Sequence, residues 1–147
     1  MCGILGYSHI AKCLPAGVLT SALKALVHRG PDHQGTFCSE QISMGATRLR
    51  ILDLEGGDQP LFSPDRNVVI VFNGEIFNYY ELRAQLEAEG LSFSTRCDTE
   101  VVLNAFLRWG STCFSRLRGM FSIAIWVQSE SRLILARDRM GINPHYS

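Results

Sequence analysis

The sequence predicts an α+β fold in which antiparallel sheets are covered by helices, and three observations lead to this prediction. Helical periodicity is confined to residues 18–27, 79–89 and 98–109. Strand-like segments follow one another closely, as at 121–127 and 132–136, so neighbouring strands can pair through short connections. The pattern does not repeat the strand-helix-strand unit from which parallel sheets are built.

Residues 1–50 are predicted to contain three strands and one helix. Residues 3–7 form a short apolar run that is expected to be a strand, and the helix at 18–27 follows it. After a loop at 28–32, further strands are expected at 35–38 and 42–49. This region therefore indicates antiparallel β-structure with loops.

Residues 68–72 are a continuous run of β-branched and aromatic side chains, which is typical of a strand covered on both faces. The run is predicted to end at Asn73-Gly74, a turn dipeptide. Asn78 and Glu81 have the spacing of a capping box at the start of the 79–89 helix. Residues 128–131 are expected to connect the last two strands as a hairpin.

Composition excludes several classes of protein. The 147 residues fit one domain, and 14 basic and 14 acidic side chains give no reason to expect a nucleic-acid partner. The start lacks a basic signal region, and no apolar run reaches the ~18 residues that span a bilayer, so a cytoplasmic protein is expected. Five cysteines without paired spacing indicate reduced thiols, and the scattered histidines predict no metal site.

Cys2 is a candidate nucleophile because of its position. Removal of Met1 would leave a thiol and a free α-amine on one residue. An α-amine has an unperturbed pKa of about 7.7–8, so it can accept the proton of a thiol whose pKa is about 8.5. The alternative is a packing cysteine beside a terminal strand, and Met-Cys-Gly on its own favours that alternative.

Asn73 and Gly74 are candidates for an oxyanion hole. The Asn carboxamide and the Gly backbone N–H can both donate to a developing negative charge, and glycine allows close approach of a substrate. Asn-Gly is also a common type I′ hairpin dipeptide, and in isolation we favour that turn.

Other charged residues have both a functional and a structural interpretation. Arg48 could hold a carboxylate in a bidentate fork, or form an ordinary surface ion pair. Asp98 could bind an ammonium group, or cap the helix that begins there. Arg29 and Asp32 are expected to brace a loop as an ion pair, and residues 137–139 to form solvated or interdomain salt bridges. The sequence contains no phosphate-binding loop for ATP.

Seven segments in order, over nearly the whole chain, resemble the glutaminase domain of glutamine-dependent asparagine synthetases. These segments are residues 1–4, 29–32, 48–53, 73–79, 98–101, 119–121 and 136–141. The joint occurrence is more specific than any one motif.

The resemblance implies the N-terminal nucleophile hydrolase fold, a four-layer αββα sandwich of two antiparallel sheets between helical layers. It implies that residues 2–147 form the glutaminase domain, and that the synthetase domain is absent after Ser147. Cys2 would attack the glutamine amide, its α-amine would shuttle the proton, and Asn73 with the Gly74 N–H would form the oxyanion hole.

The same resemblance implies the residues that bind glutamine. Arg48 would hold the α-carboxylate, and Glu75 with Asp98 would hold the α-ammonium group. Leu49 and Ile51 would supply backbone or wall contacts. No metal or cofactor is expected in this domain.

The implied reaction releases glutamate and ammonia from glutamine. A synthetase domain in cis or in trans would use the ammonia, with ATP and Mg²⁺, to amidate aspartate in asparagine biosynthesis. A homodimer formed through the full-length protein is also implied. Two alternatives stay open, another ammonia acceptor and a non-catalytic docking or regulatory domain of the same fold.

Overall fold

The computed structural model describes residues 2–9, 15–50 and 56–146. Its strands and helices are β1 Gly3–Ser8, α1 Ala16–Ala25, β2 His33–Cys38, β3 Ile42–Arg48, β4 Leu61–Phe62, β5 Val68–Ile76, α2 Tyr79–Ala88, α3 Asp98–Trp109, β6 Gly119–Val127 and β7 Arg132–Arg137. Short 3₁₀ segments lie at Val27–Arg29 (η1), Gly110–Ser115 (η2) and Gln128–Glu130 (η3). The last of these joins β6 to β7, as the predicted hairpin requires.

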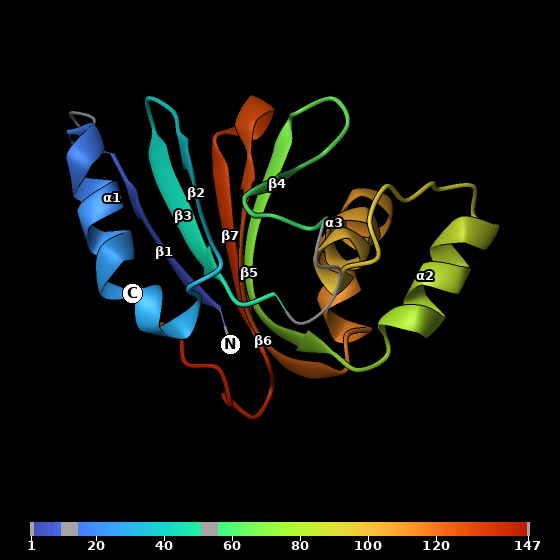
Figure 1. Ribbon diagram of the computed structural model, residues 1–147. Helices are drawn as coiled ribbons and strands as arrows, with labels where there is room; N and C mark the ends of the chain where they lie inside the picture. The colour runs from blue at the N-terminus through green and yellow to red at the C-terminus, as the bar shows by residue number, and fades with distance from the viewer. Residues whose placement is uncertain (1, 10–14, 51–55, 147) are drawn as a thin grey trace.

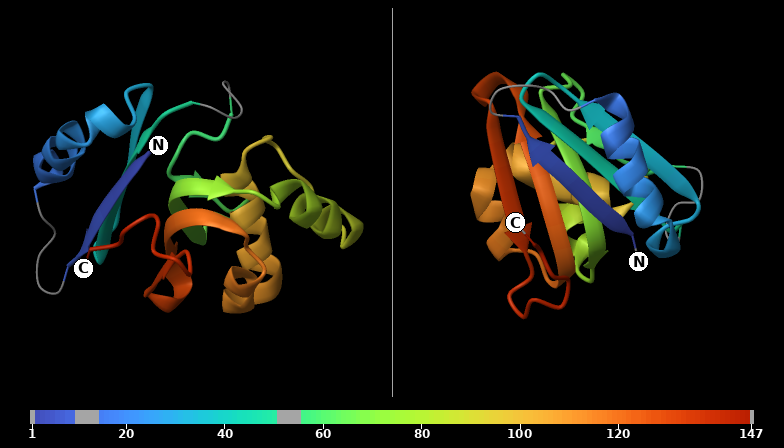
Figure 2. Two further views of the ribbon diagram at one scale, coloured as in Figure 1. Left: turned by 90° about the horizontal axis from the view of Figure 1, so that it is seen from below. Right: turned by 90° about the vertical axis from the view of Figure 1, so that its left-hand side faces the viewer.

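The described elements form four layers (Figure 1). Helix α1 covers the outer face of a sheet ordered β1-β3-β2, while α2 and α3 lie on the outer side of a sheet ordered β4-β5-β6-β7. Figure 2 shows the same order of layers from two further sides. Each pair of neighbouring strands is antiparallel. The predicted α+β class and αββα layering are therefore confirmed.

Strand β3 is the centre of the smaller sheet, and all of its residues are buried. Helix α1 packs on it from one side and β5 from the other. Its partner β1 is aligned so that Gly3 lies opposite Thr47, and the Gly3 N–H donates to Thr47 Oγ1 at 3.1 Å. This register places Cys2, the residue before β1, at the same end of the sheet as Arg48.

Strand β5 runs past its predicted end at residue 72 and continues to Ile76. Asn73 lies opposite Ser122 of β6, and Gly74 lies opposite Phe121. The type I′ turn is therefore wrong for Asn73-Gly74, because the ladder to β6 continues on both sides of the dipeptide. The turn signal fails because tertiary pairing with a long neighbouring strand outweighs a local preference.

Helix α2 begins where it is predicted to begin, but the capping box is wrong. The Asn78 side chain makes no cap hydrogen bond to the helix. Its Nδ2 donates to the Arg116 carbonyl at 3.1 Å, and its Oδ1 accepts from the Arg118 N–H at 2.9 Å, so it links α2 to the segment before β6. No helix in the described ranges is long and apolar enough to cross a bilayer.

Two apolar clusters hold the layers together. The larger lies between the four-stranded sheet and the helices, with Ile70, Val101 and Ile123 fully buried. The smaller lies between the two sheets and includes Val69 and Val71. Alternate residues of β5 thus face opposite sides of its sheet, which explains why the strand reads as a continuous apolar run.

Candidate active site

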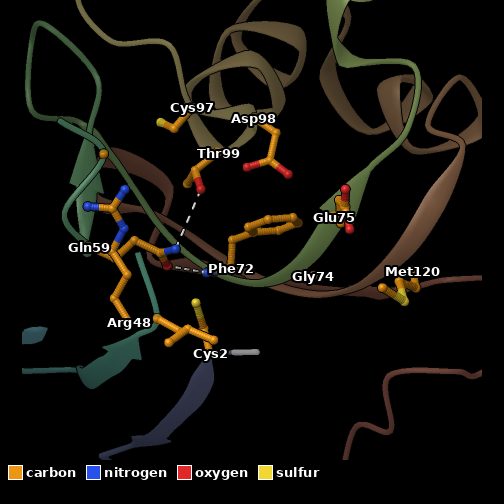
Figure 3. Close-up of a pocket in the computed structure, with 12 residues that line it drawn as sticks. Cys2, Arg48, Gln59, Phe72, Gly74, Glu75, Cys97, Asp98, Thr99 and Met120 are labelled. Carbon is orange, nitrogen blue, oxygen red and sulfur yellow. Dashed lines mark hydrogen bonds between the residues drawn. The ribbon is translucent and has the colours of Figure 1, made fainter. Parts of the chain in front are cut away.

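A pocket lies where the start of β1 and the end of β3 meet β5 and the N-terminus of α3 (Figure 3). It is lined by Cys2, Arg48, Leu49, Gly57, Gln59, Phe72, Gly74, Glu75, Cys97, Asp98, Thr99 and Met120. Six of the predicted site residues are among them, namely Cys2, Arg48, Leu49, Gly74, Glu75 and Asp98. Ile51, which is also predicted to contact the substrate, lies outside the described residues.

The Cys2 side chain points into the pocket, with its Sγ toward the wall that Phe72 and Gln59 form (Figure 3). The side chain is partly exposed, as a nucleophile that must meet a substrate requires. Its backbone is fixed by two neighbours. Arg29 Nε donates to the Cys2 carbonyl at 3.0 Å, and Gly3 is held by Thr47 in the strand register.

Arg48 ends β3 and lines the pocket, but it does not form the surface ion pair considered as an alternative. The residue is 4% exposed. Its Nη1 donates to Asp58 Oδ1 at 2.7 Å, so the guanidinium is held by a carboxylate from the loop before β4. A buried cation is stable only with such a partner.

Asp98 and Glu75 place two carboxylates along the other side of the pocket. Asp98 is the first residue of α3 and its Oδ2 accepts from the Ile76 N–H at 3.1 Å, so it ties α3 to the end of β5. The pKa of Asp98 is raised to about 6, mainly by burial and to a smaller extent by the charge of Glu75, against backbone hydrogen bonds that lower it. A cationic ligand group at this position would relieve the repulsion between the two carboxylates.

Gly74 and Asn73 lie on opposite faces of β5, because successive residues of a strand alternate between its two faces. Gly74 lines the pocket, whereas Asn73 is 7% exposed and is not among the lining residues. The Asn73 carbonyl accepts from Asn143 Nδ2 at 3.3 Å, and its buried Oδ1 finds no partner among the described residues. The backbone of Gly74 is therefore at the pocket, and the Asn73 side chain is buried beside it.

A side chain at position 74 does not fit. A Cβ there would lie 2.2 Å from the Met120 carbonyl and 2.7 Å from Phe121 Cα, at a φ of +158°. We expect Gly74→Ala to lower the free energy of unfolding by about 1–3 kcal/mol, because β6 must shift. Urea denaturation measures this change.

Gly17→Ala is the matched control for that substitution. A Cβ at Gly17, inside α1, would meet nothing within 4 Å. We expect this variant to be as stable as the wild type or more stable by up to about 1 kcal/mol. Equal stability of both variants would contradict the close packing of Gly74 against β6.

Sequence reasoning missed the loop before β4. Gln59 is buried, its Oε1 accepts from the Phe72 N–H at 2.6 Å, and its Nε2 donates to Thr99 Oγ1 at 3.4 Å (Figure 3). It thereby joins the loop to β5 and α3. The signal was a pair of polar residues, Asp58 and Gln59, between a glycine pair and a proline, in a loop of the kind that often carries function.

Two predicted ion-pair assignments need correction. Arg29 and Asp32 brace the loop through separate partners, since Arg29 contacts Cys2 whereas Asp32 Oδ2 accepts from the Arg50 N–H at 2.8 Å. Asp138 is buried and accepts the N–H groups of Phe121 and Asn143 at 3.2 and 3.0 Å. It organises the turn after β7, and the expected solvated salt bridge is wrong for it.

Known proteins are similar to the chain over nearly its whole length. The sequence profile of a family described as "Glutamine amidotransferase domain" matches residues 1–147. Asparagine synthetase [glutamine-hydrolyzing] 1 of Bacillus subtilis is 43% identical over 150 residues, which cover 99% of this chain and 24% of the relative. Asparagine synthetase [glutamine-hydrolyzing] of Zea mays is 37% identical over 148 residues, covering 99% and 25%. The chain therefore spans about a quarter of the length of these relatives.

Solved structures share the fold. The glutamine phosphoribosylpyrophosphate amidotransferase from B. subtilis, complexed with ADP and GMP, matches with a TM-score of 0.71 at 24% identity, covering 93% of this chain and 36% of that one. An allosteric regulatory enzyme of purine biosynthesis matches with a TM-score of 0.58 at 28% identity, covering 71% and 25%. These likenesses confirm the predicted N-terminal nucleophile hydrolase fold.

Proposed function

Because this chain belongs to the family of glutamine amidotransferase domains, we propose that it hydrolyses the side-chain amide of glutamine with Cys2 as the nucleophile. One observation of the structure supports this proposal most strongly. A thiol, a guanidinium group and two carboxylates from distant parts of the chain line a single pocket, and they belong to Cys2, Arg48, Glu75 and Asp98.

The charges of the pocket suit the two charged ends of an amino acid. Arg48 can hold the α-carboxylate, and Asp98 with Glu75 can hold the α-ammonium group. The uncharged amide end of glutamine is then left for the thiol of Cys2. Leu49 contributes to the wall beside Arg48. We propose that Ile51 also contacts glutamine, and this proposal rests only on the similarity of residues 48–53 to the family.

The proposed chemistry uses the N-terminal residue as both nucleophile and base. Once Met1 is removed, the α-amine of Cys2 takes the thiol proton, and the thiolate attacks the amide carbon of glutamine. The amine returns the proton to the nitrogen, so ammonia leaves and a γ-glutamyl thioester remains. Water then cleaves the thioester to give glutamate and the free thiol.

The oxyanion of each tetrahedral intermediate needs donors beside Cys2. We assign this role to the Gly74 N–H, because the Gly74 backbone lines the pocket. Asn73 is proposed as the second donor through its amide, which is buried next to Gly74 and on the face of β5 that packs toward β1.

We propose that the ammonia serves a synthetase that amidates aspartate with ATP and Mg²⁺. The 43% identity to a glutamine-hydrolysing asparagine synthetase supports this acceptor, and the relatives' fourfold greater length supports a synthetase domain in cis. Another acceptor would keep the same half-reaction and change only the partner. The domain then needs no cofactor of its own.

Labelling with a glutamine-like electrophile tests the proposal. We expect intact mass spectrometry to show loss of Met1, and incubation with 6-diazo-5-oxo-norleucine to add a single adduct on Cys2. Glutamine should protect against labelling and D-glutamine should not. Retention of Met1 would contradict the proposal, because the α-amine would be blocked as an amide, and would favour a non-catalytic domain. An adduct on Cys38 or Cys97 in place of Cys2 would contradict it as well.

A further inference from the structure

Arg48 needs to be fixed in place if it is to recognise a carboxylate. Its long side chain has several rotatable bonds, and recognition in a fork geometry requires the guanidinium to be held in one orientation. Within the described ranges, Arg48 is the one lysine or arginine that lines the pocket. Its orientation therefore matters for any anionic ligand group there.

Asp58 supplies a direct anchor for that orientation. Asp58 Oδ1 accepts from Arg48 Nη1 at 2.7 Å. The Arg48 side chain is 5% exposed and that of Asp58 is 38% exposed, so the bond lies at the boundary between the pocket wall and solvent. Burial opposes ionisation of Asp58, but hydrogen bonds from Arg48 and Arg50 outweigh it and hold the pKa of the Asp58 carboxyl below its usual value.

The loop that carries Asp58 is itself held from both sides. The side chain of the next residue, Gln59, is hydrogen-bonded to Phe72 and Thr99. The preceding Gly57 has a φ of +72°, and a Cβ there would lie 2.8 Å from Cys97 Sγ and 3.2 Å from Arg48 Nη2. The loop thus packs directly against the Arg48 guanidinium, in a backbone conformation that favours glycine.

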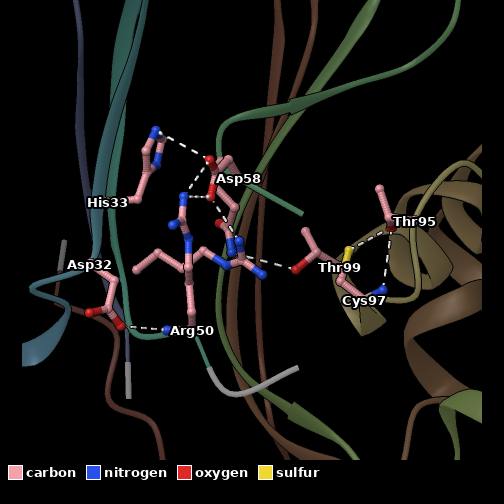
Figure 4. A network of polar contacts seen from close by, with 9 residues as sticks. Asp32, His33, Arg50, Asp58, Thr95, Cys97 and Thr99 are labelled. Atoms are coloured by element: carbon pink, nitrogen blue, oxygen red, sulfur yellow. Dashed lines mark hydrogen bonds and ion pairs between the residues drawn. The ribbon is translucent and has the colours of Figure 1, made fainter. Parts of the chain in front are cut away.

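Asp58 is also shared with a second guanidinium group and lies near an imidazole, so it does not neutralise Arg48 completely. Arg50 Nη2 lies 3.2 and 3.0 Å from the two oxygens of Asp58, and His33 Nε2 lies 3.6 Å from Oδ2 (Figure 4). Two guanidinium groups around one carboxylate leave a net positive charge, and such a cluster attracts an anion. Arg48 can therefore be anchored and still attract a ligand carboxylate.

We propose that Asp58 is a positioning residue that fixes the Arg48 guanidinium for the α-carboxylate of the substrate, and that Arg50 shares Asp58 so that Arg48 retains its attraction. This inference rests on the proposed function, because it takes glutamine as the ligand of Arg48. Residues 57–59 thereby take part in substrate recognition.

The steady-state kinetics of Asp58→Asn test the role of this anchor. We expect the KM for glutamine to rise about 10- to 100-fold, because the guanidinium loses its Asp58 anchor, while kcat stays within about twofold. Asp58→Glu keeps the charge and should recover part of the loss. Arg50→Gln should also raise KM, since Arg48, Arg50 and Asp58 together then lose their net positive charge.

A substrate without the α-carboxylate separates positioning from a general structural role. Glutaminamide, in which that carboxylate is an amide, should be hydrolysed by Asp58→Asn and wild type with equal kcat/KM. The matched control is Glu130→Gln, which breaks an exposed ion pair between Glu130 Oε2 and Arg132 Nε at 2.9 Å. It should leave kcat/KM for both substrates unchanged.

Failure of the positioning role and failure of the proposed function give different results. An unchanged KM in Asp58→Asn, or an equal loss on glutamine and glutaminamide, would overturn the positioning role. If Asp58→Asn fails to fold, the same comparison is made with Asp58→Glu, and an equal loss on both substrates would again overturn it. Failure of the proposed function would appear elsewhere, as a wild-type protein that neither hydrolyses glutamine nor is labelled on Cys2.

Discussion

Glutamine hydrolysis by Cys2→Ala is expected to fall by a factor of about 10⁴ or more, because the variant has no atom that can form the thioester. The fold should persist. Cys2 lies outside the strand ladder, and β1 is held by its register with β3 and by the Gly3–Thr47 hydrogen bond. We expect the free energy of unfolding to change by less than about 1 kcal/mol. A coupled assay for glutamate measures the activity, and thermal unfolding measures the stability.

Cys38→Ser is the matched control for that loss. Cys38 is a free, exposed cysteine at the end of β2, away from the pocket residues. This variant should hydrolyse glutamine at the wild-type rate. If Cys2→Ala kept more than a hundredth of the wild-type activity, Cys2 would not be the nucleophile, and the pocket would have another purpose.

The fold was predictable where local pattern and tertiary packing agree. The continuous apolar run in β5 predicts a strand buried on both faces, and the two core clusters confirm it. Helix α3 has the predicted bounds, because its periodic apolar residues face the core. The dipeptide Asn73-Gly74 misleads, since its local turn preference yields to the ladder with β6.

The pocket was predictable in part. Cys2, Arg48 and Asp98 occur in segments with recognisable motifs, and the fold brings them together. Asp58 and Gln59 could not be assigned, because their roles depend on contacts that only the folded chain creates. Gln59, for instance, reaches Thr99 of α3. No periodicity or spacing in a single sequence encodes such a contact.

The carboxylate of Asp98 should make glutamine binding depend on pH. Its pKa of about 6 is raised mainly by burial, so Asp98 is protonated below that pH and can no longer attract the substrate ammonium. We expect kcat/KM for glutamine to have a component that falls as the pH drops through about 6, because kcat/KM reports groups of the free enzyme. Asp98→Asn should lack this component, and its kcat/KM at pH 8 should be about 10²-fold below that of wild type.

The contribution of Asp98 to the free energy of unfolding should change with pH in the opposite direction to kcat/KM. In the unfolded chain the carboxyl of Asp98 has a pKa of about 3.9, so between pH 4 and 6 the folded protein binds the proton more tightly. The favourable contribution of this group is present at low pH and is lost as the pH rises through about 6. Asparagine at this position does not ionise. Asp98→Asn should therefore be more stable than wild type at pH 8, by up to about 3 kcal/mol, and similar to it near pH 4.

Urea denaturation at the two pH values and a pH profile of kcat/KM measure both effects on the same protein. The control is Glu87→Gln, which removes an exposed carboxylate that pairs with Arg83 on α2. It should leave the kinetic profile unchanged. Suppose that Asp98→Asn binds glutamine less well but gains no stability at pH 8. Burial of the charged Asp98 carboxylate would then not destabilise the folded protein. A variant that gains stability without losing glutamine affinity would show that the substrate ammonium is bound elsewhere, so that burial of Asp98 serves only to join α3 to the end of β5.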